Sequence, residues 1–196
     1  YDGKSIQLNN FLFRDKELSF NSKGYYEIKP FSKIISTSEI KNINTDILKK
    51  INVHEIFKFR ELIKRINGQN NINFISQRFN RNLIDSLNLK TNLAYGRLNV
   101  DKKIKIANSI LLCNSNVNLL DEFPILYFDC SINSPDKKDL LKKIKVKYKK
   151  KKEIMNLNVN GYLNILSNKI NFDYIELNDS YVATEADKQY FKNIFE

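Results

Sequence analysis

Two adjacent carboxylates, Asp121 and Glu122, are the side chains of this sequence best placed to do chemistry. They follow a short, mostly apolar run over residues 117–120, which predicts a buried strand that ends at the two acids. Nucleotide hydrolases use this arrangement at the carboxyl edge of a sheet, where one carboxylate holds Mg²⁺ and another polarises water. Acidic turn residues also end many strands for purely structural reasons, so other motifs have to support a nucleotide site.

The remaining reactive residue types favour structural roles. A single histidine, His54, excludes a multi-histidine metal site, and nothing places it beside a nucleophile. Cys113 and Cys130 are not spaced as a metal clip, and we expect them to be small buried hydrophobes rather than a redox pair. So few cysteines predict a reducing, cytosolic compartment.

Composition indicates one folded domain with a basic surface. The chain has 196 residues and a net charge of +11, and its 42% hydrophobic content argues against intrinsic disorder. Asn, Lys and Ile number 28, 27 and 25, a bias typical of an AT-rich genome, so a solvated lysine surface explains much of the charge. No apolar run approaches the ~18 residues of a membrane-spanning helix. A chain that opens on Tyr1 is expected to be a fragment of a longer one.

Hydrophobic periodicity predicts strands followed by alternating helices and strands. The first thirty residues indicate strands, and a loop is expected over 67–71. Further strands are expected over 72–75, 154–159 and 174–177, with a hairpin turn over 178–180 that leads into 181–183. Helices are expected over 53–66, 83–89, 101–112, 137–152 and 185–195, and a helical turn over 162–168. This order predicts a single α/β domain over residues 1–196, a mixed sheet with a parallel core and an antiparallel β extension.

The stretch from Lys137 to Lys152 carries the strongest local charge of the chain. Its apolar residues are spaced as on an amphipathic helix, and lysines fill the positions between them. Such a helix could contact anionic lipid headgroups or nucleic acid.

A set of motifs along the chain resembles the nucleotide-binding domain of ATP-binding cassette (ABC) transporters, most closely the exporter branch. The stretch from Pro30 to Thr37 lies where that family has its phosphate loop, and Gln77 follows forty residues later, at the place of the Q-loop glutamine. Residues 101–122 resemble the stretch from the family's signature helix to its Walker B strand. Residues 172–180 resemble its penultimate strand, and residues 185–195 resemble its closing helix. Residues 78–100 would form a much reduced helical subdomain.

The resemblance implies vestigial roles for five residues. Asp121 would be the magnesium ligand, Glu122 and Gln77 the catalytic residues, and Ser36 and Thr37 the end of the phosphate loop. The glycines of the phosphate loop are replaced, in part by the bulky Phe31, Ile34 and Ile35. The signature sequence retains a single glycine, Gly96, and Asn160 and Gly161 stand where the switch histidine is expected. A phosphate loop needs close backbone approach, so these changes predict loss of tight ATP binding.

The resulting expectation is a catalytically silent nucleotide-binding domain with a structural or regulatory role in a membrane transporter. It would lie at the cytosolic face of a membrane, beside a membrane domain and a second nucleotide-binding domain, with no cofactor or at most weak Mg-ATP. One alternative is a basic nucleic-acid-binding domain. Another is a purely structural interaction domain with an unrelated α/β fold, favoured if no parallel core places Asp121 beside the stretch from Pro30 to Thr37.

Overall fold

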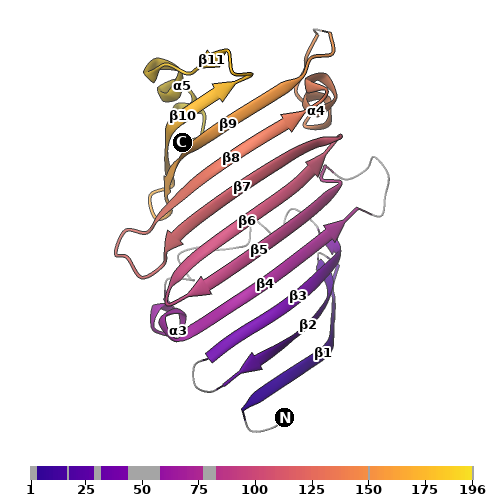
Figure 1. Cartoon of the computed structure of the whole chain (residues 1–196), viewed down its shortest axis with the longest axis vertical. Helices are drawn as coiled ribbons and strands as arrows, with labels where there is room; N and C mark the ends of the chain where they lie inside the picture. Colours follow the sequence, from indigo (N-terminus) through magenta and orange to yellow (C-terminus); the bar gives the residue numbers. More distant parts are fainter. Residues whose placement is uncertain are drawn as a thin grey trace.

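A single sheet dominates the computed structural model, which describes residues 4–16, 18–28, 32–43, 58–76, 83–149 and 151–195. Within these ranges eleven strands follow one another in space in the same order as in the chain (Figure 1). The strands are β1 (Ser5–Arg14), β2 (Leu18–Glu27), β3 (Ser32–Ile43), β4 (Ile66–Ile75), β5 (Ser86–Ala94), β6 (Arg97–Ile106), β7 (Ser109–Asn118), β8 (Ile125–Ser134), β9 (Met155–Asn164), β10 (Lys169–Leu177) and β11 (Tyr181–Val182). Three short helices, α3 (Arg60–Arg65), α4 (Lys137–Lys143) and α5 (Glu185–Phe195), lie at its margins.

The expected α/β fold with a parallel core is wrong. Nine of the ten strand pairs are antiparallel, and only β3 and β4 run parallel. A parallel pair needs a long crossover, and here α3 lies in that connection. The architecture is therefore a β-rich meander, and residues 86–94, expected in a helical subdomain, form strand β5.

The helix expected over 101–112 is instead the hairpin of β6 and β7. Its turn residues Ala107 and Asn108 have φ of 47° and 65°, the left-handed values of a two-residue hairpin turn. Ile104 and Leu111, seven positions apart, face each other across the two strands. Their spacing imitates two helical turns, because two residues equidistant from a hairpin turn also share one face.

Asparagine explains why β5 and the first part of β4 were missed, although residues 72–75 were expected as a strand and lie in β4. It is depleted in most strands and common in turns, so residues 67–71 predicted a loop. Here Asn71, Asn73 and Asn88 lie on the polar side of the sheet and bond one another across strands. The Asn88 side chain donates to Asn71 Oδ1 at 2.8 Å and to Asn73 Oδ1 at 2.6 Å.

The lysine-rich helix expected over 137–152 stops at Lys143. Lys145 adopts a left-handed φ of 66°, and its N–H donates to the Lys142 carbonyl at 3.0 Å. The Val146 N–H donates to the Leu141 carbonyl at 2.8 Å, which completes a Schellman cap. The described residues beyond it, up to β9, are neither helix nor strand.

Several local predictions are confirmed. The first thirty residues contain β1 and β2, residues 155–159 of the strand expected over 154–159 fall in β9, and the turn over 178–180 leads into β11. The closing helix α5 spans the predicted residues 185–195, and Thr184 and Asp187 form a capping box in which the Thr184 N–H donates to Asp187 Oδ2 at 2.9 Å. The helical turn expected over 162–168 is wrong, because β9 continues to Asn164. None of the described helices has the length and apolarity to cross a membrane.

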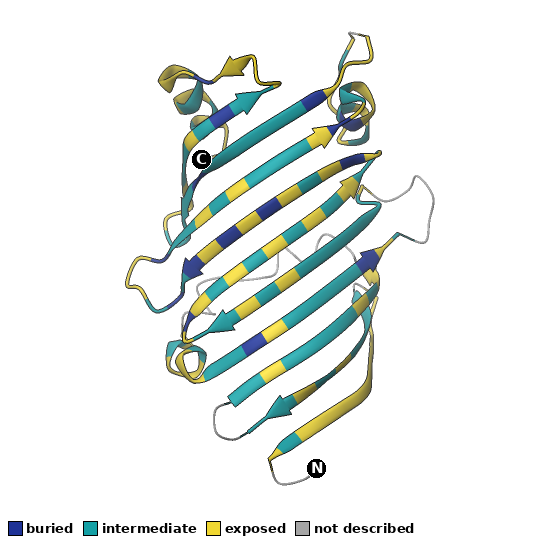
Figure 2. Cartoon of the chain, in the orientation of Figure 1, coloured by how far each residue is buried: buried dark blue, intermediate teal, exposed yellow. Residues whose placement is uncertain are grey.

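The sheet has two chemically different faces. Side chains alternate along each strand, so one face of β6 carries Leu98, Val100 and Ile104 while the other carries Asn99 and Lys103. The pairing registers extend these two sets over the sheet. We call the side of Val100 the inner face and the side of Lys103 the polar face. Figure 2 shows the alternation of exposed and less exposed residues along β6 and β7.

Both ends of the sheet bend at a glycine beside a strand irregularity. Gly24 of β2 lies beside the shift in β1 between Leu8 and Phe11, and Gly161 of β9 lies beside the shift in β10 after Phe172. A Cβ atom on either glycine would clash with the backbone of the neighbouring strand, at Ile35 or Asn171. These close approaches let the outer strands curve, as the path of β1 and β2 shows in Figure 1.

Candidate ligand-binding face

The residues predicted to form a nucleotide site do not come together. Ser36 and Thr37 are neighbours within β3, so their side chains point to opposite faces of the sheet. Asp121 and Glu122 lie in the turn after β7, four strands away from β3, or about 19 Å at the usual strand spacing. Gln77, Pro30, Phe31 and His54 lie outside the described residues.

Asp121 has a structural role in the β7–β8 turn. Its Oδ1 accepts from the Asn118 side chain at 2.6 Å, and its carbonyl accepts from Arg60 at 2.9 Å. The carbonyl of Glu122 also accepts from Arg60, at 3.4 Å. Asp121 lines a polar hollow of about 420 Å³ on the polar face together with Arg97 and Tyr127. Among the described residues, no cluster of three or more carboxylate, histidine or cysteine side chains could hold a metal ion.

Two apolar rows cross the inner face at right angles to the strands. The strand registers align their side chains from β1 to β10. The first row consists of Ile6, Tyr26, Ile34, Leu93, Leu98, Val117, Leu126, Leu163 and Ile170. The second consists of Phe13, Phe20, Ile40, Phe74, Leu87, Ile104, Leu111, Ile132, Leu157 and Leu177.

A narrow polar band separates the two rows near the middle of the sheet. At β2 to β5 its side chains bond one another: Ser38 donates to Ser22 at 2.9 Å, Ser36 to Asn70 Oδ1 at 2.7 Å, and Asn70 to Thr91 at 3.1 Å. Ser36, proposed as a phosphate contact, therefore bonds within the sheet. On β6 and β7 the band continues with Lys102 and Ser115.

The inner face is open at its β1 end. Ile6, Leu8, Phe11 and Phe13 are 39–45% exposed, and Ile34 is 38% exposed. Figure 2 shows β1 as almost entirely exposed, so the sheet presents apolar surface that a compact fold would cover.

An apolar hollow of about 400 Å³ lies in this open region. Ile6, Leu8, Tyr26 and Ile34 line it from three neighbouring strands, and Ile66 at the start of β4 completes it. Phe20 packs against Phe11 and Phe13 beside it, with ring centroids 5.9 and 5.3 Å apart. A hollow of this volume is within the range of small-molecule sites.

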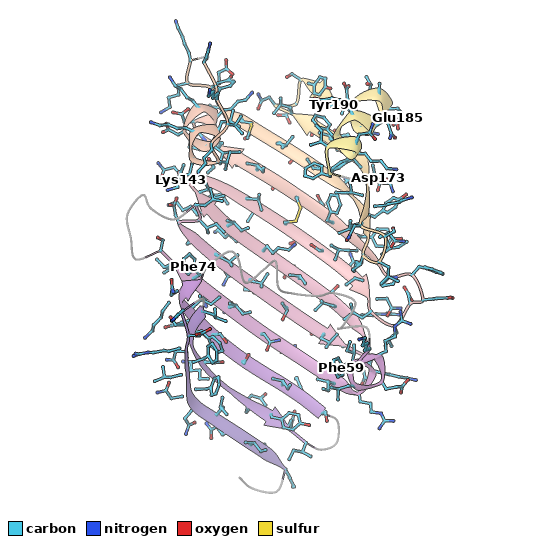
Figure 3. All side chains as sticks on the ribbon, turned by 180° about the vertical axis from the view of Figure 1, so that it is seen from behind. Phe59, Phe74, Lys143, Asp173, Glu185 and Tyr190 are labelled. Atoms are coloured by element: carbon cyan, nitrogen blue, oxygen red, sulfur yellow. A yellow bond between two sulfur atoms is a disulfide. The ribbon has the colours of Figure 1, made fainter. Side chains whose placement is uncertain are left out.

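The opposite end of the inner face is covered and cross-linked. Cys113 of β7 and Cys130 of β8 are register partners and form a disulfide, visible as a yellow bond in Figure 3. Phe172 of β10 contacts Phe128 on one side and Phe195 of α5 on the other, with centroid distances of 6.2 and 5.9 Å. The expectation that the two cysteines are unpaired is therefore wrong.

Sequence reasoning missed the inner face because its apolar residues lie on ten strands that were not all identified. Within a strand such as β6, however, the alternation from Leu98 to Ile106 was visible in the sequence. No protein-family model, curated protein or solved structure matches this chain.

Proposed function

We propose that the protein is a non-enzymatic binding module that holds an alkyl-chain ligand against the inner face of its sheet. One observation carries this proposal: two apolar rows, the first interrupted at Gly68 of β4, cross the sheet and are open to solvent at its β1 end. Covering such surface releases roughly 25 cal/mol for each Å² removed from water. An apolar ligand therefore gains free energy wherever it covers an exposed part of a row.

The chemistry of the face favours an alkyl chain over a polar ligand. Aliphatic and phenyl side chains offer no directional contacts, and the band residues of β2 to β5 bond one another. The hollow bounded by Leu8, Tyr26 and Ile34 is a starting point from which a chain could follow the first row.

Of the functions expected from the sequence, the structural interaction domain fits best, although the α/β fold expected for it is wrong. Its condition was a sheet without a parallel core beside Asp121, and the meander meets that condition. The silent nucleotide-binding domain, with its transporter partners and its place at a cytosolic membrane face, remains an untested prediction. Because its expected fold is absent, we do not carry it further.

The disulfide bears on the compartment. Cross-strand disulfides persist in oxidising compartments and are rare in the cytosol. We therefore propose an oxidising location for this domain, in place of the reducing one expected from the cysteine count.

A titration with 11-(dansylamino)undecanoic acid tests the binding proposal. Dansyl emission rises when the probe enters an apolar site, so we expect a saturable increase. Leu8 and Leu12 provide a matched pair, because both lie exposed on β1, at 44% and 53%, on opposite faces of the sheet. Leu8→Asp should weaken binding about tenfold or more, since it buries a charge beside the chain. Leu12→Asp should bind as the wild type does. Equal loss in both variants, or no saturable binding to the wild type, would refute the proposal.

The lysine-rich corner supports a second function, contact with an anionic membrane surface. The 19 residues from Asp136 to Ile154 contain ten lysines and three carboxylates, a net charge of +7 out of +11. Between these lysines Ile144, Val146 and Ile154 are 41%, 49% and 65% exposed. Exposed aliphatic side chains among lysines suit the headgroup region of a bilayer.

Nucleic acid fits this corner less well. Its aromatic residue, Tyr148, donates to Glu153 at 2.6 Å and lies 5.1 Å under the Lys137 amine, so its ring is not free to stack on a base.

Sedimentation with vesicles of 30% phosphatidylglycerol should recover the protein, and Ile144→Ser with Val146→Ser should reduce recovery. If the protein binds single-stranded oligonucleotides and the two substitutions do not weaken that binding, the nucleic-acid alternative is favoured.

A further inference from the structure

Lys102 occupies an unusual position on the inner face. It lies on the central strand β6, and its register partners are Leu89 on β5 and Cys113 on β7. The inner-face residues that flank it on these two strands are all uncharged: Leu87, Leu89, Thr91, Leu111, Cys113 and Ser115. In strands β4 to β9 it is the one charged residue on this face.

No described residue compensates the charge of Lys102. The structure gives its amine no ion pair and no hydrogen bond within the described part of the chain. Burial alone lowers its pKa below the ordinary 10.5. An unpaired, half-buried cation destabilises a fold, so its presence here calls for a partner that arrives from outside.

A buried hydroxyl next to Lys102 also lacks a partner. Ser115 is 4% exposed, and its Oγ makes no hydrogen bond in the described structure. It lies two positions along β7 from Cys113, which places it diagonally across from Lys102. Diagonal neighbours on one sheet face are about 7–8 Å apart, so a single anionic group can lie between an amine and a hydroxyl in these positions.

We propose that Lys102 and Ser115 bind the anionic head of an amphiphile whose alkyl chain lies along the apolar rows. The carboxylate or phosphate oxygens would accept from the Lys102 Nζ and the Ser115 Oγ, which satisfies both groups at once. This inference rests on the proposed alkyl-chain function and adds to it the charge of the ligand and the point where its head is held.

The position of Lys102 within the polar band agrees with this assignment. Toward β3 the band is closed by its own bonds through Ser36, Asn70 and Thr91. At β6 and β7 the band offers the Lys102 amine and the Ser115 hydroxyl, neither of which has a partner among the described residues, and the apolar rows pass on both sides, through Leu98 and Ile104. A charged head at this point leaves its chain in contact with aliphatic side chains.

Paired probes and a matched variant test the proposal. The probes are 11-(dansylamino)undecanoic acid and its methyl ester, which differ in charge but share the chain. The variants are Lys102→Met, Lys102→Arg, and Lys103→Met as the control, because Lys103 is the next residue and lies on the polar face. Far-UV circular dichroism and thermal unfolding of each variant show that it is folded.

We expect the wild type to bind the acid at least about tenfold more tightly than the ester, as a charge-assisted hydrogen bond predicts. Lys102→Met should bind both probes with the affinity of the ester, while Lys102→Arg and Lys103→Met retain the preference. If the wild type binds the ester and the acid equally and Lys102→Met has the same affinities, this inference is overturned, while the alkyl-chain function is still supported. Failure of both probes to bind would overturn the function itself.

Discussion

The two ends of this sheet solve the same packing problem in opposite ways. At the β7 to β10 end, a disulfide joins neighbouring strands and Phe172 is held between Phe128 and Phe195 of helix α5. At the β1 to β3 end, Phe11, Phe13 and Leu8 are of similar chemistry but remain 39–45% exposed. The inner face is therefore a hydrophobic core at one end and an accessible surface at the other. A ligand can enter at the accessible end.

Loss of the disulfide should give the largest effect on stability. The bridge closes a loop with a sequence separation of 17 residues. Its removal in a Cys113→Ala, Cys130→Ala double variant should cost about 3 kcal/mol. The loss of stability is measured by thermal unfolding of three samples: the oxidised wild type, the variant, and the wild type in reductant. An unchanged melting temperature in reductant would mean that the covered end does not depend on the bridge.

Truncation of one phenylalanine at each end compares how much the two ends contribute to the free energy of unfolding. Phe172→Ala should cost about 2–3 kcal/mol, because its ring contacts two others under α5. Phe11→Ala should cost less than about 1 kcal/mol, since the ring is already 45% exposed. Urea unfolding of both variants gives the two values. Equal costs would contradict the distinction between a core end and an open end.

Replacement of Lys102 by methionine should stabilise the protein by about 1 kcal/mol at neutral pH, a small figure because the side chain is only half-buried. The folded state lowers the pKa of Lys102 below the 10.5 of the unfolded chain. The unfolded state therefore binds the proton more strongly, and the stability of the wild type rises with pH between those two pKa values. The advantage of Lys102→Met should shrink over the same window. A variant less stable than the wild type at neutral pH would show that the amine has a partner.

The smallest expected effect concerns the cap of α4. Lys145 adopts a left-handed φ of 66° that favours glycine. Lys145→Gly should therefore raise the melting temperature slightly, by an amount worth up to about 1 kcal/mol. Lys147→Gly is the control, because this exposed residue has no such φ and should gain nothing. A gain of the same size at both positions would exclude the cap as the cause.

Local structure could be predicted from this sequence wherever side-chain chemistry and backbone geometry agree. The helix over residues 185–195 and the turn at Asn178 before the last hairpin were predicted, and in the structure Thr184 and Asp187 cap that helix. The strands rich in asparagine were not predictable from propensity, because Asn88 and Asn71 become favourable in a strand only when the neighbouring strand supplies their partners. In these strands the pairing between neighbouring strands, not local propensity, determines the structure.

The candidate site was still harder to predict. Lys102 stands among exposed lysines in the sequence, and only the register with Leu89 and Cys113 shows that it lies on the apolar side. The pair Asp121 and Glu122 drew attention through a motif, yet their place in a turn is explained by bonds to Asn118 and Arg60. A local motif indicates chemistry only when the sheet brings its partners to it.

Photolabelling tests the central claim most directly. A photoactivatable alkyl-diazirine analogue of icosanoic acid, whose chain can span the five strand spacings, about 24 Å in total, from Lys102 on β6 to β1, is irradiated with the oxidised protein. Mapping by mass spectrometry reports which side chains the chain contacts. The account predicts labels on Leu8, Phe11, Phe13 and Ile34, competed away by unlabelled acid, and none on Leu12 or Tyr25 of the polar face, although these are 53% and 41% exposed. Labels spread equally over both faces, or confined to the polar face, would contradict it.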